Sequence, residues 1–282
     1  MKPRAVLTEI LAVLLFILFM FPFYIVLISA GKNTQEIINS PLSPPNGISV
    51  LLSNISTIIN HENVRYPSSF LTSIIIVAGS VVLIILTSSM AAWVLVRTKS
   101  KLSSGIFMMF VAAMVIPFQV IMFPLVQWFR MMGDFLHIPL LYTHRGLIFA
   151  YMGFGASLSI FLYHGFIKSI PYELEEAANI DGCSRAGTFF RIIFPLLSPI
   201  SVTVMILNGL WIWNDYLLPL MILSIGKSVQ TLPLAVMNFA GSYVKQWDLI
   251  LTAALMAIIP VIIVYLFLQR YIIKGMTEGA IK

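Results

Sequence analysis

Charged residues and cysteines are both scarce in this 282-residue sequence. Asp, Glu, Lys and Arg together make up 10% of the chain, whereas hydrophobic residues make up 59%. A soluble domain normally has about 25% charged residues, so this composition excludes an ordinary water-soluble protein. The single cysteine, Cys183, excludes a disulfide within the chain. We therefore expect a protein whose outer surface is solvated largely by lipid.

Patterns for metal binding, nucleotide binding and catalysis are also missing. The four histidines show no metal-ligand spacing with one another or with Cys183. Gly226-Lys227-Ser228 matches the end of a phosphate-binding loop, but Met221 stands where the first glycine of that loop would be. No nucleophile is paired with a base within the apolar stretches. We predict no metal site, no cofactor and no enzymatic activity in this chain.

Long uncharged stretches, by contrast, are abundant. Six of them reach about 20 residues or more, the helical length that crosses the roughly 30 Å hydrocarbon core of a bilayer. Runs such as LLFILFMFPFYIVLI are continuously apolar and lack the alternation of barrel strands. The sequence therefore predicts an all-α integral membrane protein, with six transmembrane helices in one domain. The expected spans cover about residues 8–30, 69–96, 104–128, 146–167, 197–220 and 249–270.

The placement of lysine and arginine predicts the orientation of these spans. With the N-terminus inside, the cytoplasmic segments carry 11 of the 17 basic residues and the outer segments carry 6. Basic residues in short loops are retained on the cytoplasmic side, so we expect both termini in the cytoplasm. Topology signals and anionic lipid account for the net charge of +6. We therefore expect the protein to interact with the lipid bilayer and not with nucleic acid.

Two segments on the predicted outer side are longer than simple connections. The first, residues 32–65, contains the turn-rich stretch Ser40–Gly47. The second, residues 224–248, has four apolar residues at i, i+3, i+4 and i+7 spacing, namely Leu232, Ala235, Val236 and Phe239. This spacing predicts a short amphipathic helix at the outer surface, with a seventh or re-entrant membrane segment as the alternative.

The predicted cytoplasmic loop of residues 168–196 carries a dense polar pattern. Pro171 suits the first position of a helix, and the glutamates that follow favour the positive end of its dipole. Asp181-Gly182 supplies a C-terminal stop, because glycine adopts the left-handed conformation readily. Ser184 can cap a second short helix. Four acidic residues and no basic ones lie between Pro171 and Asp181, so we predict a helix-turn-helix that offers an acidic surface to a basic cleft.

This loop and its surroundings resemble the binding-protein-dependent ABC importer permeases. The segment EAANIDGCSRAGTFFRIIFPLLSP, from Glu176 to Pro199, is similar to the EAA loop of that family. The segments SIPYELEEAA, VIPFQVIMFPL, WNDYLLPL and LQRYIIKGMTEGAIK are similar to its carbohydrate-uptake branch, which includes the smaller maltose-system permease. With the six-span hydropathy, the resemblance covers nearly the whole chain. Cys183 departs from it, standing where the family usually has alanine.

The resemblance implies a division of labour among separate proteins. This chain would pair with a second, homologous permease subunit and form half of a translocation pathway for a sugar or oligosaccharide. Two cytoplasmic ATPase subunits would bind ATP and Mg, and an extracytoplasmic solute-binding protein would deliver the substrate. The complex would lie in the inner, or plasma, membrane of a prokaryotic cell. The residues assigned on this basis to ATPase coupling are Glu173, Glu175, Glu176, Ala177, Ala178, Asp181, Gly182, Phe190 and Pro195.

Candidates for the substrate pathway come from the polar residues of the apolar stretches. The presence of Asp215 in an apolar stretch requires an explanation, because placing a carboxylate at mid-depth in a bilayer costs about 2.5–3.5 kcal/mol. It shares a helical face with Asn208 and Trp211, and such amides and aromatic rings suit the hydroxyls and CH faces of carbohydrate. The alternative is an ordinary anchor at the outer interface. Asn214 and Gln119 complete the candidate set.

Two other functions remain open at this point. The same scaffold can import a polyol or glycerol phosphate, although an anionic substrate favours basic residues along the pathway and the uncharged stretches contain none. A stand-alone secondary transporter is the second alternative. It needs inverted repeats or buried residues that bind a coupling ion, and the sequence shows neither.

Overall fold

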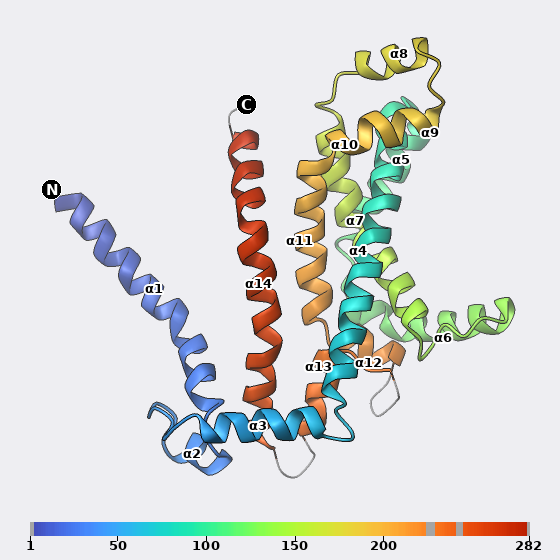
Figure 1. Cartoon of the computed structure of the whole chain (residues 1–282). Coiled ribbons are helices and arrows are strands. Elements are labelled where there is room, and N and C mark those ends of the chain that lie inside the picture. The colour runs from blue at the N-terminus through green and yellow to red at the C-terminus, as the bar shows by residue number, and fades with distance from the viewer. Residues whose placement is uncertain (1–2, 224–228, 241–244, 281–282) are drawn as a thin grey trace. The chain divides into compact units, whose positions relative to one another are not determined.

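The computed structural model describes residues 3–223, 229–240 and 245–280, with side chains for 7–223, 229–240, 245–267 and 269. Within these ranges the chain is helical and forms no named strand (Figure 1). The all-α fold class is therefore confirmed. The chain divides into two compact units. The first consists of Met1–Ser69 with Leu234–Ile263, and the second of Phe70–Pro233 with Val264–Lys282.

Four continuous helices are long and apolar enough to cross a membrane. They are α1 (Pro3–Ser29), α4 (Tyr66–Arg97), α7 (His144–Ile167) and α14 (Trp247–Ala280). Two bent helix pairs pass the same test, and they raise the number of candidate spans among the described residues to 6 if each pair counts as one span. The six spans expected from the sequence are reached only by counting each pair as one span, namely Lys101–Ala113 with Phe118–Leu136 and Arg185–Leu196 with Ser198–Asn214, the second bent by 74°.

The third expected span, residues 104–128, is not one straight helix. The first half, α5 (Lys101–Ala113), and the second half, α6 (Phe118–Leu136), meet at an angle of 108°. Pro117 explains the break, because proline lacks an N–H donor and restricts the residue before it to extended backbone. Pro117 itself is extended, with φ −63° and ψ 135°. With 13 residues, α5 is about 20 Å long and falls short of the full hydrocarbon core.

The fifth expected span, residues 197–220, ends earlier than predicted. Its helix, α11 (Ser198–Asn214), stops at Asp215, which has a ψ of 131°, and the chain resumes as α12 (Leu217–Leu223). The Asp215 carboxylate accepts a hydrogen bond of 3.0 Å from the backbone N–H of Leu217. Such local side-chain bonds compete with the helical ladder, so the aspartate itself favours the stop.

The first unit contains more helix than its turn-rich sequence suggested. The expected outer excursion holds α2 (Thr34–Asn39) and α3 (Ser49–Asn60). The buried amide of Asn54, on α3, donates to the backbone oxygen of Ala30 at 3.2 Å and lies 3.4 Å from the hydroxyl of Thr252. These bonds tie α3 to the ends of two apolar helices within the same unit.

The short helix predicted after residue 231 is present, although not as a surface element. It consists of α13 (Leu232–Val236) and the 3₁₀ turn η2 (Met237–Phe239), together too short to cross a bilayer. Leu232 and Phe239 are almost completely buried, so the apolar face packs inside protein. Gly226-Lys227-Ser228 and residues 241–244 lie outside the described residues, so only part of the expected outer segment is seen.

The second unit is built around α7, which contacts α5, α11 and α12. At Gly155 the helices come so close that an added Cβ would lie 2.5 Å from Cδ1 of Ile84 and 2.7 Å from Oδ1 of Asn208. One turn further on, Asn208 donates a 3.1 Å hydrogen bond to the hydroxyl of Ser159. Small residues and interhelical hydrogen bonds are the usual means by which apolar helices associate in membranes.

Candidate functional site

The polar loop folds as two short helical limbs joined at Gly182. The first limb, α8 (Glu173–Ile180), begins two residues after Pro171 and not at it, because Tyr172 provides the first helical carbonyl. The N–H of Gly182 bonds to the oxygen of Asn179 at 3.1 Å, and the N–H of the next residue bonds to the oxygen of Ala178 at 2.9 Å. With φ +79° at Gly182, this is a Schellman motif. The predicted glycine stop is confirmed.

The second limb runs from Ser184 into α11. The Ser184 hydroxyl accepts a 3.2 Å hydrogen bond from the N–H of Gly187, so the predicted cap of α9 (Arg185–Thr188) is confirmed. A π-helical segment, η1 (Phe189–Ile193), then leads into α10 (Phe194–Leu196). Because Pro195 has no N–H to offer the carbonyl of residue 191, the i to i+4 ladder is interrupted there, and the wider π turn accommodates the interruption.

The loop presents carboxylates and apolar side chains together on its exposed surface. Glu173, Glu176 and Asp181 are exposed, and so is Ala177. Ile180 is 85% exposed, an unusual position for a large apolar residue in a polar loop. Other exposed residues of the two limbs are Tyr172, Leu174, Phe190 and Pro195. The surface of the loop therefore combines negative charge with apolar area.

Glu175 and Ala178, also predicted to face a partner, face the chain's own interior instead. Glu175 is only 5% exposed, and Oε1 of its carboxylate lies 2.7 Å from Nε of Arg97, the last residue of α4. Its second oxygen accepts a 3.1 Å hydrogen bond from Nε1 of Trp93. Sequence reasoning missed this pair because Arg97 lies 78 positions earlier in the chain. The only available signal was a basic residue at the end of a span on the same predicted side as the loop.

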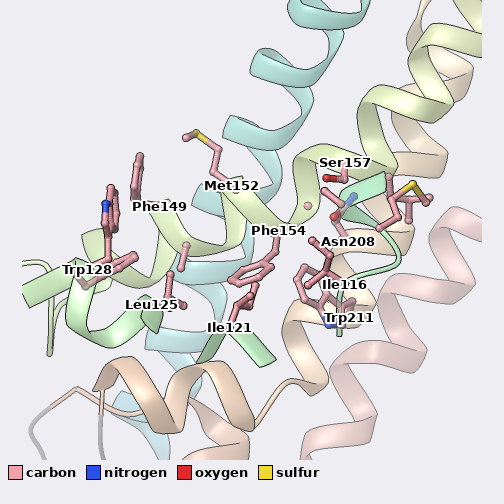
Figure 2. Close-up of a pocket in the computed structure, with 17 residues that line it drawn as sticks. Ile116, Ile121, Leu125, Trp128, Phe149, Met152, Phe154, Ser157, Asn208 and Trp211 are labelled. Atoms are coloured by element: carbon pink, nitrogen blue, oxygen red, sulfur yellow. The ribbon is translucent and has the colours of Figure 1, made fainter. Parts of the chain in front are cut away.

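A cavity of about 570 Å³ lies between α5, α6, α7 and α11 of the second unit (Figure 2). Its wall is mostly apolar and aromatic, and none of its lining residues is charged. The rings and polar groups that face it include Trp128, Phe149, Phe154, Ser157, Asn208 and Trp211. Aromatic faces with a few placed polar groups are typical of small-molecule sites.

Two of the five predicted pathway residues line this cavity. The Asn208 side chain is 3% exposed and is held by Nδ2 bonds to Ser159 Oγ at 3.1 Å and to the backbone oxygen of Val204 at 2.9 Å. Trp211 is 43% exposed, and its ring meets Tyr151 edge-on with 5.5 Å between centroids. The predicted face shared by Asn208 and Trp211 therefore does border a hollow.

The other three predicted pathway residues do not line the cavity. Asp215 terminates α11 and accepts a 3.0 Å hydrogen bond from the hydroxyl of Tyr151, so its role in the fold is to form a turn. The amide of Asn214 donates to the carbonyl of Leu210 in its own helix. Gln119 is exposed and does not line the cavity. The prediction of one continuous polar face failed for Asp215 because the helix ends before it.

No group of three or more His, Cys, Asp or Glu side chains within the described residues is placed to bind a metal ion. The aromatic wall contributed by α6 and α7 was not found from the sequence. Phe149, Phe154 and Trp128 sit among many other apolar residues, so their spacing alone carries no signal that separates a cavity wall from a lipid-facing surface.

Comparisons with known proteins identify the family of the chain. Residues 84–278 match the family described as "Binding-protein-dependent transport system inner membrane component". The chain is 42% identical to the probable starch degradation products transport system permease protein AmyC of Thermoanaerobacterium thermosulfurigenes, covering 96% of this chain and 95% of that protein. It is 37% identical to the melibiose/raffinose/stachyose import permease protein MelC of Bacillus subtilis, covering 93% and 91%.

A further relative agrees with this assignment, and a solved structure shares the fold. The chain is 35% identical to the multiple sugar-binding transport system permease protein MsmG of Streptococcus mutans, covering 94% of this chain and 93% of that protein. A chain in the crystal structure of a bacterial ABC transporter that imports the acidic polysaccharide alginate shares the fold, with a TM-score of 0.79 at 18% identity and coverage of 95% and 96%. The protein therefore belongs to the family of binding-protein-dependent transport system inner membrane components, and it is a multi-pass membrane protein.

Proposed function

We propose that this chain is the permease subunit of an ATP-driven importer and forms half of the translocation pathway for a neutral sugar or oligosaccharide. The observation that carries the substrate class is the cavity, whose wall combines aromatic rings with an amide and a hydroxyl and holds no charged residue. Such a wall suits the CH faces and hydroxyls of carbohydrate. The names of three relatives, which refer to starch degradation products, multiple sugars and melibiose, support the same class.

A glycerol phosphate importer fits this cavity less well. A phosphate needs cationic or densely packed N–H groups along its path, and the lining offers neither Lys nor Arg. A polyol would present the same hydroxyls as a sugar, so it differs from the proposal only in the absence of a ring. The two are distinguished by measuring whether an excess of a sugar or of a linear polyol inhibits uptake by the reconstituted complex more strongly.

The polar loop is the proposed contact with the ATPase. Its exposed carboxylates and the apolar side chain of Ile180 offer one surface of mixed character, which suits a basic cleft with an apolar floor. In this proposal two ATPase subunits bind ATP and Mg, a second permease subunit completes the pathway, and an extracytoplasmic binding protein delivers the sugar. Closure of the ATPase pair would then rock the membrane helices between outward and inward access.

Purification of the chain from its native cell in a mild detergent tests the proposal most directly. We expect a second permease and an ATPase to co-purify, and sugar-loaded binding protein to stimulate ATP hydrolysis by the reconstituted complex. A screen of neutral sugars against the binding protein then names the substrate. Sugar transport by the isolated chain in ATP-free vesicles would instead favour the secondary transporter.

The cavity predicts a specific defect for Trp211→Ala. We expect the maximal rate of sugar uptake to fall about tenfold, because loss of the ring removes roughly 1.4 kcal/mol of interaction with sugar in the pathway. Sugar affinity of the separate binding protein should not change. Trp211→Phe should retain most activity, and Trp247→Ala, outside the cavity, serves as the matched control. Equal rates in Trp211→Ala and the control would contradict a pathway role.

The proposed orientation can be read from cysteine accessibility. In a chain with Cys183→Ala, a membrane-impermeant maleimide should label Ile180→Cys only in inside-out vesicles, because the loop is assigned to the cytoplasm. Ser43→Cys, on the predicted outer side, should be labelled only in right-side-out vesicles. Both positions are exposed, so labelling reports sidedness and not burial. The reverse pattern would invert the topology and remove the loop from the ATPase.

A further inference from the structure

We propose that Trp93, Arg97 and Glu175 form a strap that makes α4 move as one body with the polar loop of residues 168–196. This inference rests on the proposed function and deepens it, since it names a third membrane helix that the ATPase would drive. The loop is continuous in sequence with α7 and α11 only. The strap adds α4 (Tyr66–Arg97), a helix that precedes the loop by more than 70 residues.

The Glu175 carboxylate is bound through both of its oxygens. Oε1 lies 2.7 Å from Nε of Arg97, and Oε2 accepts a 3.1 Å hydrogen bond from Nε1 of Trp93. This is the one ion pair between side chains within the described part of the chain, and it is well shielded, with 18% and 6% of the two side chains exposed. A charge-assisted bond in such surroundings is strong and is weakly screened by salt.

Arg97 also holds the backbone that enters α8. Its Nη2 donates a 3.0 Å hydrogen bond to the carbonyl oxygen of Ile170, and its guanidinium carbon lies 5.5 Å from the ring centroid of Tyr172. The planar guanidinium thereby contacts Ile170 and Tyr172, which lead into α8, and Glu175 within α8. Lysine, which presents a point charge without this fork, cannot reproduce the arrangement.

Trp93 connects α4 to the second limb of the loop. Its ring lies 5.3 Å from the ring of Phe189, measured between centroids, and Phe189 is 2% exposed within the π-helical segment. One side chain of α4 therefore touches Glu175 in the first limb and Phe189 in the second. Because both limbs are attached, a displacement of the loop in either direction acts on α4.

Trp93 and Arg97 of the strap lie on α4, the helix that also carries Ile84, which closely approaches Gly155 of α7. Ile84, which faces Gly155, is nine residues before Trp93, a separation of about 14 Å along a rigid helix. Gly155 and Asn208 both line the cavity. A movement of the strap is thus transmitted by α4 to the contact behind the cavity wall, which gives the loop a route to the sugar pathway besides its two flanking helices.

The inference is tested by the number of sugar molecules imported per ATP hydrolysed in the reconstituted complex. For Trp93→Phe, which keeps an aromatic ring near Phe189 but loses the indole N–H that donates to Glu175, and for Glu175→Gln, we expect this ratio to fall roughly threefold to thirtyfold. The ratio of sugar imported to ATP hydrolysed should fall by a similar factor in Arg97→Lys. Glu62→Gln, an exposed acidic position outside the loop, is the matched control and should keep the wild-type ratio.

A distance measurement tests whether α4 and the loop move together when ATP binds, or whether the strap only stabilises the resting structure. In a Cys183→Ala background, spin labels at Thr98 and Ala186, both exposed, report the distance between the end of α4 and the second limb. We expect the same distance with and without ATP when the strap is intact, and an ATP-dependent change in Trp93→Ala, which removes both the hydrogen bond to Glu175 and the ring contact with Phe189. A nucleotide-dependent change with the strap intact would overturn the inference.

The two proposals fail in different ways. If the wild-type complex hydrolyses ATP but imports no sugar, the proposed function is wrong. If the wild-type complex imports sugar, and Trp93→Phe and Glu175→Gln insert, retain the ATPase and keep the wild-type ratio, the strap is wrong and the proposed function stands. Co-purification of the ATPase with each variant shows whether the complex is assembled, and Trp93→Phe, which leaves the Glu175–Arg97 ion pair in place, supplies the decision if Glu175→Gln does not assemble.

Discussion

Gly182→Val should lower sugar uptake by about tenfold or more while the subunit still inserts into the membrane. Gly182 has a φ of +79°, and a β-branched side chain in that region costs on the order of 1–3 kcal/mol. The two hydrogen bonds that close the end of α8 require this conformation, so relief of the strain would change the angle between the two limbs. ATP hydrolysis should continue without matching uptake.

A graded series at this position separates conformation from bulk. Asparagine tolerates the left-handed region better than alanine, so we expect Gly182→Asn to keep more uptake than Gly182→Ala, and valine to keep least. An added Cβ at Gly182 meets nothing within 4 Å, so crowding alone predicts no such order. Gly105→Val, on a helix with similarly open surroundings, is the control. Wild-type uptake in Gly182→Val would count against the coupling role of the loop.

Gly155→Val should destabilise the subunit by interfering with the packing of α7 against α4 and α11. Even a Cβ would lie 2.5 Å from Ile84 and 2.7 Å from the side-chain oxygen of Asn208. Asn208 is fixed by its two hydrogen bonds and cannot move away without losing them. Overpacking of this kind costs about 1–3 kcal/mol, so the melting temperature of the solubilised complex should fall by about 2–12 °C.

The control for this change lies on the same helix. An added Cβ at Gly165 meets nothing within 4 Å, so Gly165→Val should leave the melting temperature near that of the wild type. Ile84→Ala combined with Gly155→Ala should recover part of any loss caused by Gly155→Ala, because the shorter side chain removes the nearest obstacle. Equal melting temperatures for Gly155→Val and Gly165→Val would show that the contact of α7 with Ile84 and Asn208 leaves room for a side chain at position 155.

The features predicted well from the sequence are those whose cause is local. The stop at Gly182 and the cap at Ser184 depend on residues within five positions, so their chemistry is visible in a short segment. Long apolar runs likewise identify the membrane helices, because hydrocarbon thickness fixes their length. Resemblance in the loop also pointed to the family, and the match over residues 84–278 confirmed that family.

The features that were missed depend on direction or on distant partners. Hydropathy measures apolarity and not the helix axis, so the bend at Pro117 was hidden within a continuous apolar stretch even though the proline was visible. Asp215 was placed on a helical face by assuming that the helix continued past Asn214. The pairing of Glu175 with Arg97 joins segments 78 positions apart and has no local signature.

The internal neutralisation of Glu175 also changes what the loop offers to its surroundings. Of the four carboxylates between Pro171 and Asp181, the three that reach solvent are Glu173, Glu176 and Asp181. Exposed charges are screened within about 8 Å at physiological ionic strength, whereas a shielded pair is screened far less. Raised ionic strength should therefore weaken the binding of a basic partner to this loop. The ion pair between Glu175 and Arg97, which attaches the loop to α4, should persist.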